Sequence, residues 1–365
     1  MAETDQMPSL KHWIVTLKTI LLLAVASCEQ PLPKQTVLKV EGTTMGTVYH
    51  ITSINPKNPA NLNRCVDSIL LEINMEVNTY DSLSLISQLN NGKVIELPVI
   101  LNPNRLNAQK GGHLAANLLL AQKPYEYSSG AFDPTVGPLT EYYGFGATQK
   151  VGDQVKQEEI EELLNFVGFT NILVDTVDQS QLNVRVAKKG VRLDLSAIAK
   201  GYAVDQISHL LETNFDCTSY FVEIGGETRS SGWSPRETEW TIGINKPETN
   251  ASLTDIELII GISNAAIATS GNYRNRRIIG GQSYVHTIDP QTGIAKPSKL
   301  LSATVVANDC ATADAFATAC MASAENAEQV LQKADLSGYL IFANGDNTFE
   351  TRFVGNFEEY VFEGN

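Results

Sequence analysis

Apolar residues recur at two different spacings along the chain, and each spacing predicts a different kind of element. In Asn61–Met75 the apolar side chains lie three or four positions apart, which places them on one face of a helix. Val37–Ile54 alternates in places around a Gly-Thr-Thr-Met-Gly-Thr segment, so we expect two strands joined by a tight turn. Further helices are predicted at Leu106–Gln122, Glu158–Val167, Thr312–Ala324 and Asn326–Ala334.

Shorter apolar runs bounded by turn-forming residues predict the other strands. Strand runs with helices inserted between them predict an α+β protein with mixed or antiparallel sheets and packed helices. No linker divides the chain after residue 36, so a single domain is expected over residues 37–365. The stretch Gly130–Gln149, rich in Gly, Pro and aromatic residues, predicts a long active-site loop. The predicted strands are Ile172–Val174, Gln181–Val186, Val191–Leu193, Tyr220–Ile224, Trp240–Ile244, Asp255–Ile260, Ala265–Thr269, Tyr284–Ile288, Ser302–Ala307 and Tyr339–Ala343.

Residues 1–28 have the pattern of a secretion signal. Two lysines and a histidine precede the apolar run Ile20–Ala26, which is too short for a transmembrane helix. Val25-Ala26-Ser27-Cys28 resembles a bacterial lipobox, in which the cysteine is lipidated; ordinary signal cleavage is the alternative. A lipid on Cys28 would leave residues 29–36 as a tether and hold the protein at a bacterial cell membrane, on its periplasmic or extracytoplasmic face.

The composition and the net charge limit the kinds of molecule that the protein is expected to bind. Hydrophobic residues make up 43% of the chain and charged residues 19%, which is typical of a soluble globular protein. A formal net charge of −14 argues against nucleic acid as a partner, because a phosphate backbone needs a basic surface. An anionic nucleotide still fits if a divalent metal and a few cationic side chains reverse the sign locally. Cys65, Cys217, Cys310 and Cys320 have no metal-binding spacing; a disulfide is permitted, but buried free cysteines are favoured.

The segment Leu193–Tyr202 is the first candidate for chemistry. It places a carboxylate, Asp194, and an ammonium group, Lys200, around a predicted helix over Ala197–Ala203 with Ser196 as its N-cap. Small side chains at a helix N-terminus let a ligand reach free N–H groups, which favour anions. The segment therefore indicates a phosphate or metal-phosphate site, although an ordinary surface pair on a helix explains this window equally well.

The segment Asn308–Met321 is the second candidate. Asp314 and Thr318 are four residues apart on a predicted helix, so their oxygens lie on one face. A carboxylate beside a hydroxyl among alanines leaves room for a hard cation such as Mg²⁺, which takes one or two protein oxygens and fills its other positions with water and phosphate. Taken alone, this pattern fits a solvated Asp near a helix start better.

Two further segments carry candidate residues. His286 stands at the end of a predicted strand, where an imidazole can serve as a general base near neutral pH; a structural histidine is the commoner alternative. Asp133 precedes Pro134, which keeps its backbone extended at a loop edge. Phe132 could stack on a planar ring or simply anchor the loop.

The common nucleotide and hydrolase motifs are absent from the sequence: there is no Gly-x-Gly-x-x-Gly before a helix, Walker-type lysine loop, Gly-x-Ser-x-Gly or His-Glu-x-x-His. Instead, eight segments taken in order resemble the ApbE-type FAD:protein FMN transferases, which implies the T-fold-like architecture of that family. The matching segments are Thr44–Thr47, Asn78–Tyr80, Ala131–Leu139, Asp194–Tyr202, Val222–Glu227, Ala268–Gly271, His286–Pro290 and Ala313–Thr318.

The resemblance implies a reaction and a set of site residues. Such an enzyme splits FAD at its pyrophosphate, transfers FMN to a Thr or Ser hydroxyl of an exported redox protein as a phosphoester, releases AMP and requires Mg²⁺. The resemblance implies that the backbone carbonyl of Ala197, with Asp314 and Thr318, holds the metal, and that His286 activates the acceptor hydroxyl. The FAD site would be lined by Met45, Tyr80, Ala131, Phe132, Asp133, Asp194, Lys200 and Ile288.

Two alternatives stay open at this point. A metal-dependent FAD pyrophosphatase would use the same residues with water as the acceptor and would produce free FMN and AMP. A non-catalytic flavin-binding lipoprotein would bind FAD without cleaving it, and the intact pair of Asp314 and Thr318 makes this the weaker alternative.

Overall fold

The structure is a computed structural model that describes residues 35–100, 111–149, 151–248, 252, 254–272, 275–345 and 348–362. Contacts group Val37–Asn365 into one unit. The predicted signal peptide, residues 1–28, and most of the predicted tether lie outside the described residues, so both stay predictions. Among the helices of the described ranges, none is long and apolar enough to cross a lipid bilayer.

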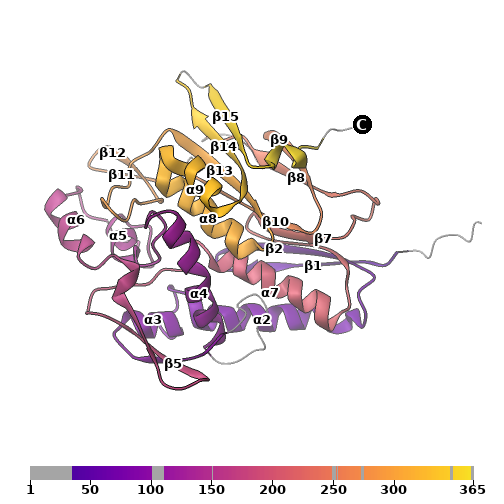
Figure 1. Ribbon diagram of the computed structural model, residues 1–365, viewed down its shortest axis with the longest axis horizontal. Coiled ribbons are helices and arrows are strands. Elements are labelled where there is room, and N and C mark those ends of the chain that lie inside the picture. The colour runs from indigo at the N-terminus through magenta and orange to yellow at the C-terminus, as the bar shows by residue number, and fades with distance from the viewer. Residues whose placement is uncertain are drawn as a thin grey trace, which may run out of the picture. The chain divides into compact units, whose positions relative to one another are not determined.

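Eight strands form the main sheet, and all neighbouring strands in it are antiparallel (Figure 1). The alternating pattern explains its inner pairings: Tyr49 and Ile51 lie opposite Ile224 and Val222, and all four side chains are buried in one core. The order across the sheet is β1 (Val37–Thr44), β2 (Thr47–Ile54), β6 (Ser219–Ile224), β7 (Glu227–Ser231), β10 (Ala265–Gly271), β13 (Leu300–Ala307), β14 (Ser337–Ala343) and β15 (Phe349–Val354).

Helices pack on one face of this sheet, with α7 (Ala199–Asn214) and α8 (Cys310–Ser323) in direct contact with the strands and with each other (Figure 1). Five of the six alanines of α8 are buried, and their small size lets the helix lie close to the strands on one side and to α7 on the other. A Cβ at Gly201 would lie 2.3 Å from the carbonyl oxygen of Cys310, so this approach of the two helices requires glycine. Three further helices contact this pair: α2 (Leu62–Val77) lies against α7, while α4 (Gly112–Tyr127) and α9 (Ala327–Ala334) lie against α8.

A second, smaller core lies against the strands β10, β13 and β14. It is formed with the hairpin of β8 (Trp240–Asn245) and β9 (Ile256–Ile262) and with the 3₁₀ helix η4 (Phe357–Tyr360). The sheet therefore has buried side chains on both of its faces. The remaining elements are η1 (Pro59–Asn61), α3 (Leu85–Asn90), β3 (Ile95–Pro98), α5 (Gly137–Tyr142), α6 (Gln157–Leu164), η2 (Phe169–Asn171), β4 (Ile172–Thr176), β5 (Gln181–Val186), β11 (Arg276–Ile279), β12 (Gln282–Val285) and η3 (Ala324–Asn326).

The α+β prediction is confirmed, and the strongly periodic segments fold as expected. The helix predicted at Asn61–Met75 is α2, and the two strands predicted in Val37–Ile54 are β1 and β2. The part of the helix predicted from Leu106 that precedes Gly111 lies outside the described residues. The four cysteines among the described residues are free, as the sequence analysis favoured over a disulfide.

Four local predictions were wrong. The strand predicted at Tyr284–Ile288 is β12, which ends at Val285 and does not extend to Ile288. Val191–Leu193 forms no strand; only Arg192 makes an isolated bridge, to Val136, while its two apolar neighbours are buried in the core. The stretch Gly130–Gln149 is not one continuous loop, because it contains the helix α5; the proline in the first turn of α5 stands where the missing N–H is not needed. Ser196 caps no helix: α7 begins three residues later, and both the N–H and the hydroxyl of Ser196 donate to Asp194.

Candidate active site

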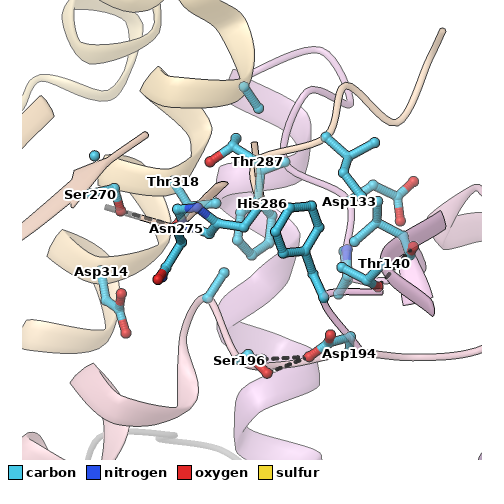
Figure 2. A pocket seen from close by; sticks show the side chains of 18 of the residues that line it. Asp133, Thr140, Asp194, Ser196, Ser270, Asn275, His286, Thr287, Asp314 and Thr318 are labelled. Carbon is cyan, nitrogen blue, oxygen red and sulfur yellow. Dashed lines mark hydrogen bonds between the residues drawn. The ribbon is translucent and has the colours of Figure 1, made fainter. Parts of the chain in front are cut away.

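A pocket of about 790 Å³ gathers residues from segments far apart in the sequence. Of the twelve side chains predicted for the site, eleven line it; Met45, in the turn between β1 and β2, is not among the lining residues. In Figure 2, Asp314 and Thr318 lie on one side of the pocket and Asp133 and Asp194 on the other, with His286 between them. The eleven are Tyr80, Ala131, Phe132, Asp133, Asp194, Ala197, Lys200, His286, Ile288, Asp314 and Thr318.

The contact between α7 and α8 builds the charged side of the pocket. The backbone N–H of Gly201, in the first turn of α7, donates to Asp314 Oδ2 at 3.0 Å. Lys200 Nζ lies 3.7 Å from the same oxygen and 3.1 Å from Glu227 Oε1. Burial lowers the pKa of Lys200, but the two carboxylates outweigh it and raise that pKa above its ordinary value. Lys200 therefore carries a fixed positive charge between two buried carboxylates.

Glu227 is one of the site residues that sequence reasoning did not assign. Its side chain lines the pocket from the start of β7 and is buried, and its Oε2 has no hydrogen-bond partner in the described part of the chain. Burial raises the pKa of Glu227, and the neighbouring ammonium of Lys200 opposes this rise. The only sequence signal was a carboxylate directly after a Gly-Gly turn, which is weak without the packing of β7 against α7.

The donor set on this side of the pocket fits a hard cation. The carboxylate of Asp314 and the hydroxyl of Thr318 are one helical turn apart, and Thr318 shares a hydrogen bond of 3.3 Å with Ser270. Ala197 lies in the turn before α7, on the same pocket. No group of three or more His, Cys, Asp or Glu side chains that could hold a metal occurs in the described ranges. The oxygens present, with the unpartnered Oε2 of Glu227, match instead the few protein ligands that Mg²⁺ uses.

His286 directly follows β12 and has the features of a base. Burial lowers the pKa of its ring, and the charge of Lys200 lowers it further, against a hydrogen bond to the Asn275 backbone. Because that bond favours the protonated ring, the imidazole donates it. Nδ1 is buried and has no partner among the described residues, so the lone pair that it carries in the neutral ring is unused. The ring of Phe145 meets it edge to face, with centroids 6.3 Å apart.

Asp133 and Asp194 differ in how their oxygens are used. Both oxygens of Asp133 are engaged within the protein: Oδ1 accepts the N–H and the hydroxyl of Thr135, at 2.7 and 2.6 Å, and Oδ2 accepts the N–H of Phe169 at 3.1 Å. Burial raises the pKa of Asp133, and these hydrogen bonds oppose the rise. Asp133 thus fixes the loop after α4, while Asp194 uses Oδ1 to hold Ser196 in the turn before α7.

The two aromatic residues predicted for the FAD site are placed differently. Phe132 is buried within the main core, and its N–H donates to Ser128. Tyr80 is 60% exposed, and its hydroxyl donates to the carbonyl oxygen of Phe145 at 3.4 Å. Tyr80 is therefore the better placed of the two to lie against a planar ring that enters from solvent.

Fold and site together define a class: an α+β protein whose pocket combines oxygen donors suited to a hard cation with a lysine and a neutral histidine, an arrangement that suits a phosphate-containing ligand. The chain belongs to the ApbE family, whose sequence profile matches residues 45–340. It is similar to the FAD:protein FMN transferase of Haemophilus influenzae, with 32% identity over 342 residues, 92% of this chain and 94% of that protein. The Vibrio cholerae protein of the same name is 31% identical over 96% of this chain and 99% of its own length.

Solved structures agree with the fold. The flavin transferase ApbE from Vibrio cholerae superposes with a TM-score of 0.74 and 28% identity over 90% of this chain and all of that chain. The Pseudomonas stutzeri flavinyl transferase ApbE, in its apo form, gives a TM-score of 0.76 and 26% identity over 92% of this chain and all of its own. The predicted architecture is thus confirmed at the level of the family.

Proposed function

We propose that this chain is an FAD:protein FMN transferase. It moves FMN from FAD to a Thr or Ser hydroxyl of an exported redox protein, forms a phosphoester and releases AMP in a Mg²⁺-dependent reaction. Relatives that carry this activity in their names match nearly the whole chain. The observation that carries the proposal is the common pocket in which Lys200 and the Asp314 oxygens lie together with a histidine whose Nδ1 is free.

In the proposed reaction the acceptor oxygen forms a bond to the FMN phosphorus, and the bond from that phosphorus to the AMP oxygen breaks. His286 takes the hydroxyl proton on Nδ1, which its lowered pKa keeps unprotonated at neutral pH. Lys200 supplies positive charge to the diphosphate and to the departing AMP. Mg²⁺, when held by Asp314, Thr318 and the Ala197 carbonyl, would offset the negative charge of the diphosphate.

The proposed FAD contacts divide by their chemistry. Tyr80 offers an aromatic face, while Ala131, Phe132 and Ile288 offer apolar surface at the wall of the pocket. The acidic members, Asp133 and Asp194, position loops by internal hydrogen bonds and present their remaining surface to the nucleotide. Met45 would contribute from the β1–β2 turn, where its φ of +48° is an unusual conformation for a residue with a side chain.

The test is a mass spectrum of an acceptor protein after incubation with the purified chain, FAD and Mg²⁺. We expect the acceptor to gain one FMN group, one AMP to appear for each group added, and a chelator to stop both. Asp314→Asn should abolish the transfer, whereas Glu328→Gln, which changes an exposed carboxylate on α9, should leave it unchanged. Release of AMP at the same rate without any acceptor would favour the FAD pyrophosphatase instead.

We also propose that a lipid on Cys28 anchors the protein to a bacterial cell membrane at its extracytoplasmic face. The support is the lipobox-like sequence that ends at Cys28, followed by a proline-containing tether. Expressed in a bacterium, the chain should fractionate with membranes, and Cys28→Ala should release it into the soluble exported fraction. A Cys28→Ala protein that stays with the membranes would contradict the anchor.

A further inference from the structure

The hairpin of β11 and β12 leads from solvent to the pocket. Its strands pair from Arg276 opposite Val285 to Ile279 opposite Gln282, and a two-residue turn, Gly280-Gly281, closes the far end. At the near end, Arg276 and Arg277 line the pocket together with His286, the residue that follows β12. A chain lying along this hairpin would therefore point one of its ends at the proposed base.

The register of the hairpin shows which backbone groups of β11 do not pair with β12. A two-residue turn makes Ile279 and Gln282 a hydrogen-bonded pair, and such pairs alternate along an antiparallel ladder. The N–H and C=O groups of Arg276 and Ile278 therefore point away from β12. Val285 lies opposite Arg276, and its backbone groups likewise point away from the partner strand: its N–H donates to the Ala295 carbonyl at 2.7 Å. Ala295 thus covers part of the outer edge of β12, while β11 pairs with no other strand in the described ranges.

The side chains of β11 offer a partner both apolar surface and positive charge. Ile279 is buried below the hairpin, and the Arg277 guanidinium lies over the Phe145 ring at 5.6 Å. Ile278, on the opposite face, is 70% exposed, so an apolar side chain lies on the open edge beside the pocket. Arg276 and Arg277 place two positive charges next to the pocket of a chain whose net charge is −14.

We propose that the outer edge of β11 binds an extended segment of the acceptor protein as an added strand. The backbone groups of Arg276 and Ile278 would pair with the segment, its acidic side chains would face the two arginines, and its Thr or Ser hydroxyl would continue into the pocket toward His286. Main-chain pairing of this kind gives affinity through the backbone and leaves specificity to a few side chains. The inference rests on the proposed transferase function and names how that function's protein substrate is held.

The decisive variant is Ile278→Pro, because it removes an N–H that the hairpin does not use and leaves the ladder with β12 intact. Its matched control is Ile278→Ala, which removes the side chain and keeps the N–H. The probe is the exported domain of a flavin-carrying subunit from an ion-pumping electron-transport complex, prepared without FMN. We expect Ile278→Pro to raise the KM for this domain about tenfold, with FAD affinity and melting temperature unchanged, and Ile278→Ala to raise it less than threefold.

A second measurement tests the same backbone pairing without the Ile278→Pro substitution. Amide hydrogen exchange at Arg276 and Ile278 should slow when the chain binds a form of the probe in which Val replaces the target Thr. Unchanged exchange at both amides, or an equal rise in KM for the Pro and Ala variants, would overturn the added strand while wild-type transfer proceeds. If the wild-type chain modifies no acceptor at all, the transferase proposal fails first and the docking strand fails with it.

Discussion

Replacing Asp205 should destabilise the protein and disturb the metal side of the pocket at the same time. This carboxylate of α7 is fully buried and accepts three hydrogen bonds: from Arg229 Nη1 at 2.8 Å and from the N–H groups of Cys310 and Ala311, both at 2.9 Å. The two N–H groups belong to the first turn of α8, one turn before Asp314. Asp205 thus fixes where α8 begins, and with it the position of Asp314 relative to α7.

The size of the effect depends on what replaces the carboxylate. Asp205→Ala leaves a half-buried guanidinium and two buried N–H groups without this partner. Removing one member of a buried ion pair costs roughly 3–5 kcal/mol, and because the Arg229 side chain is 25% exposed we expect a cost at the lower end of that range. Asp205→Asn keeps one oxygen but turns an NH₂ group toward an N–H donor, which we expect to cost roughly 1–3 kcal/mol. Burial raises the pKa of Asp205 to about 7 against the opposing effect of Arg229, so the neutral amide avoids part of the penalty of burying charge.

Urea unfolding of the two variants, followed by fluorescence, measures these differences, and calorimetric titration with Mg²⁺ and FAD measures the effect on the pocket. Glu328→Gln is the control, because its exposed pair with Arg352 contributes about 0–1 kcal/mol. We expect wild type to be the most stable, Asp205→Asn to be less stable and Asp205→Ala to be the least stable. The affinity for Mg²⁺ and FAD should fall in the same order. An Ala variant within 1 kcal/mol of wild type, or less destabilised than the Asn variant, would refute the role given to Asp205.

Three further predictions concern the pocket itself. Lys200→Met removes the ammonium 3.7 Å from Asp314, so calorimetry should show tighter Mg²⁺ binding and FAD binding weakened about tenfold; weaker binding of both would contradict the charge assignment. His286→Gln should slow transfer at least a hundredfold. In wild type the lowered pKa should confine the acid-side loss of rate to pH values below the usual histidine value of about 6.5, and this limb should vanish in His286→Gln. Gly201→Ala forces its Cβ against the Cys310 carbonyl and should cost about 1–3 kcal/mol or more in urea unfolding.

An element could be predicted from the sequence when the spacing of its own residues shows which of its faces is buried. The helix α2 has one buried and one exposed face, so its apolar spacing predicts it directly. The strand β7 was missed because its buried residues include Glu227, Thr228 and Ser230, polar side chains with no apolar alternation. The opposite error occurred at Val191–Leu193, where an apolar run packs into the core without joining a ladder. Neighbours distant in sequence decided both cases.

The same reasoning separates the parts of the site that the sequence could predict from the parts that it could not. Asp314 and Thr318 share a helix face, and Asp194 and Lys200 flank one turn, so each pair is visible in a short window. The approach of Glu227 to Lys200 depends on the packing of β7 against α7. Likewise, the stacking of Arg277 on Phe145 joins a hairpin to a loop more than a hundred residues earlier, and no spacing rule reports it.

The arrangement of charge explains how an acidic chain can present a site for an anion. At physiological ionic strength, interactions between exposed charges fade beyond about 8 Å, so carboxylates elsewhere on the surface matter little inside the pocket. There, the oxygens of Asp133 are occupied by internal donors, and Lys200 lies between Asp314 and Glu227. A divalent ion at Asp314 would compete with Lys200 for that carboxylate and free the ammonium to meet a phosphate. Metal binding should therefore strengthen FAD binding, and by linkage FAD should strengthen metal binding by the same factor.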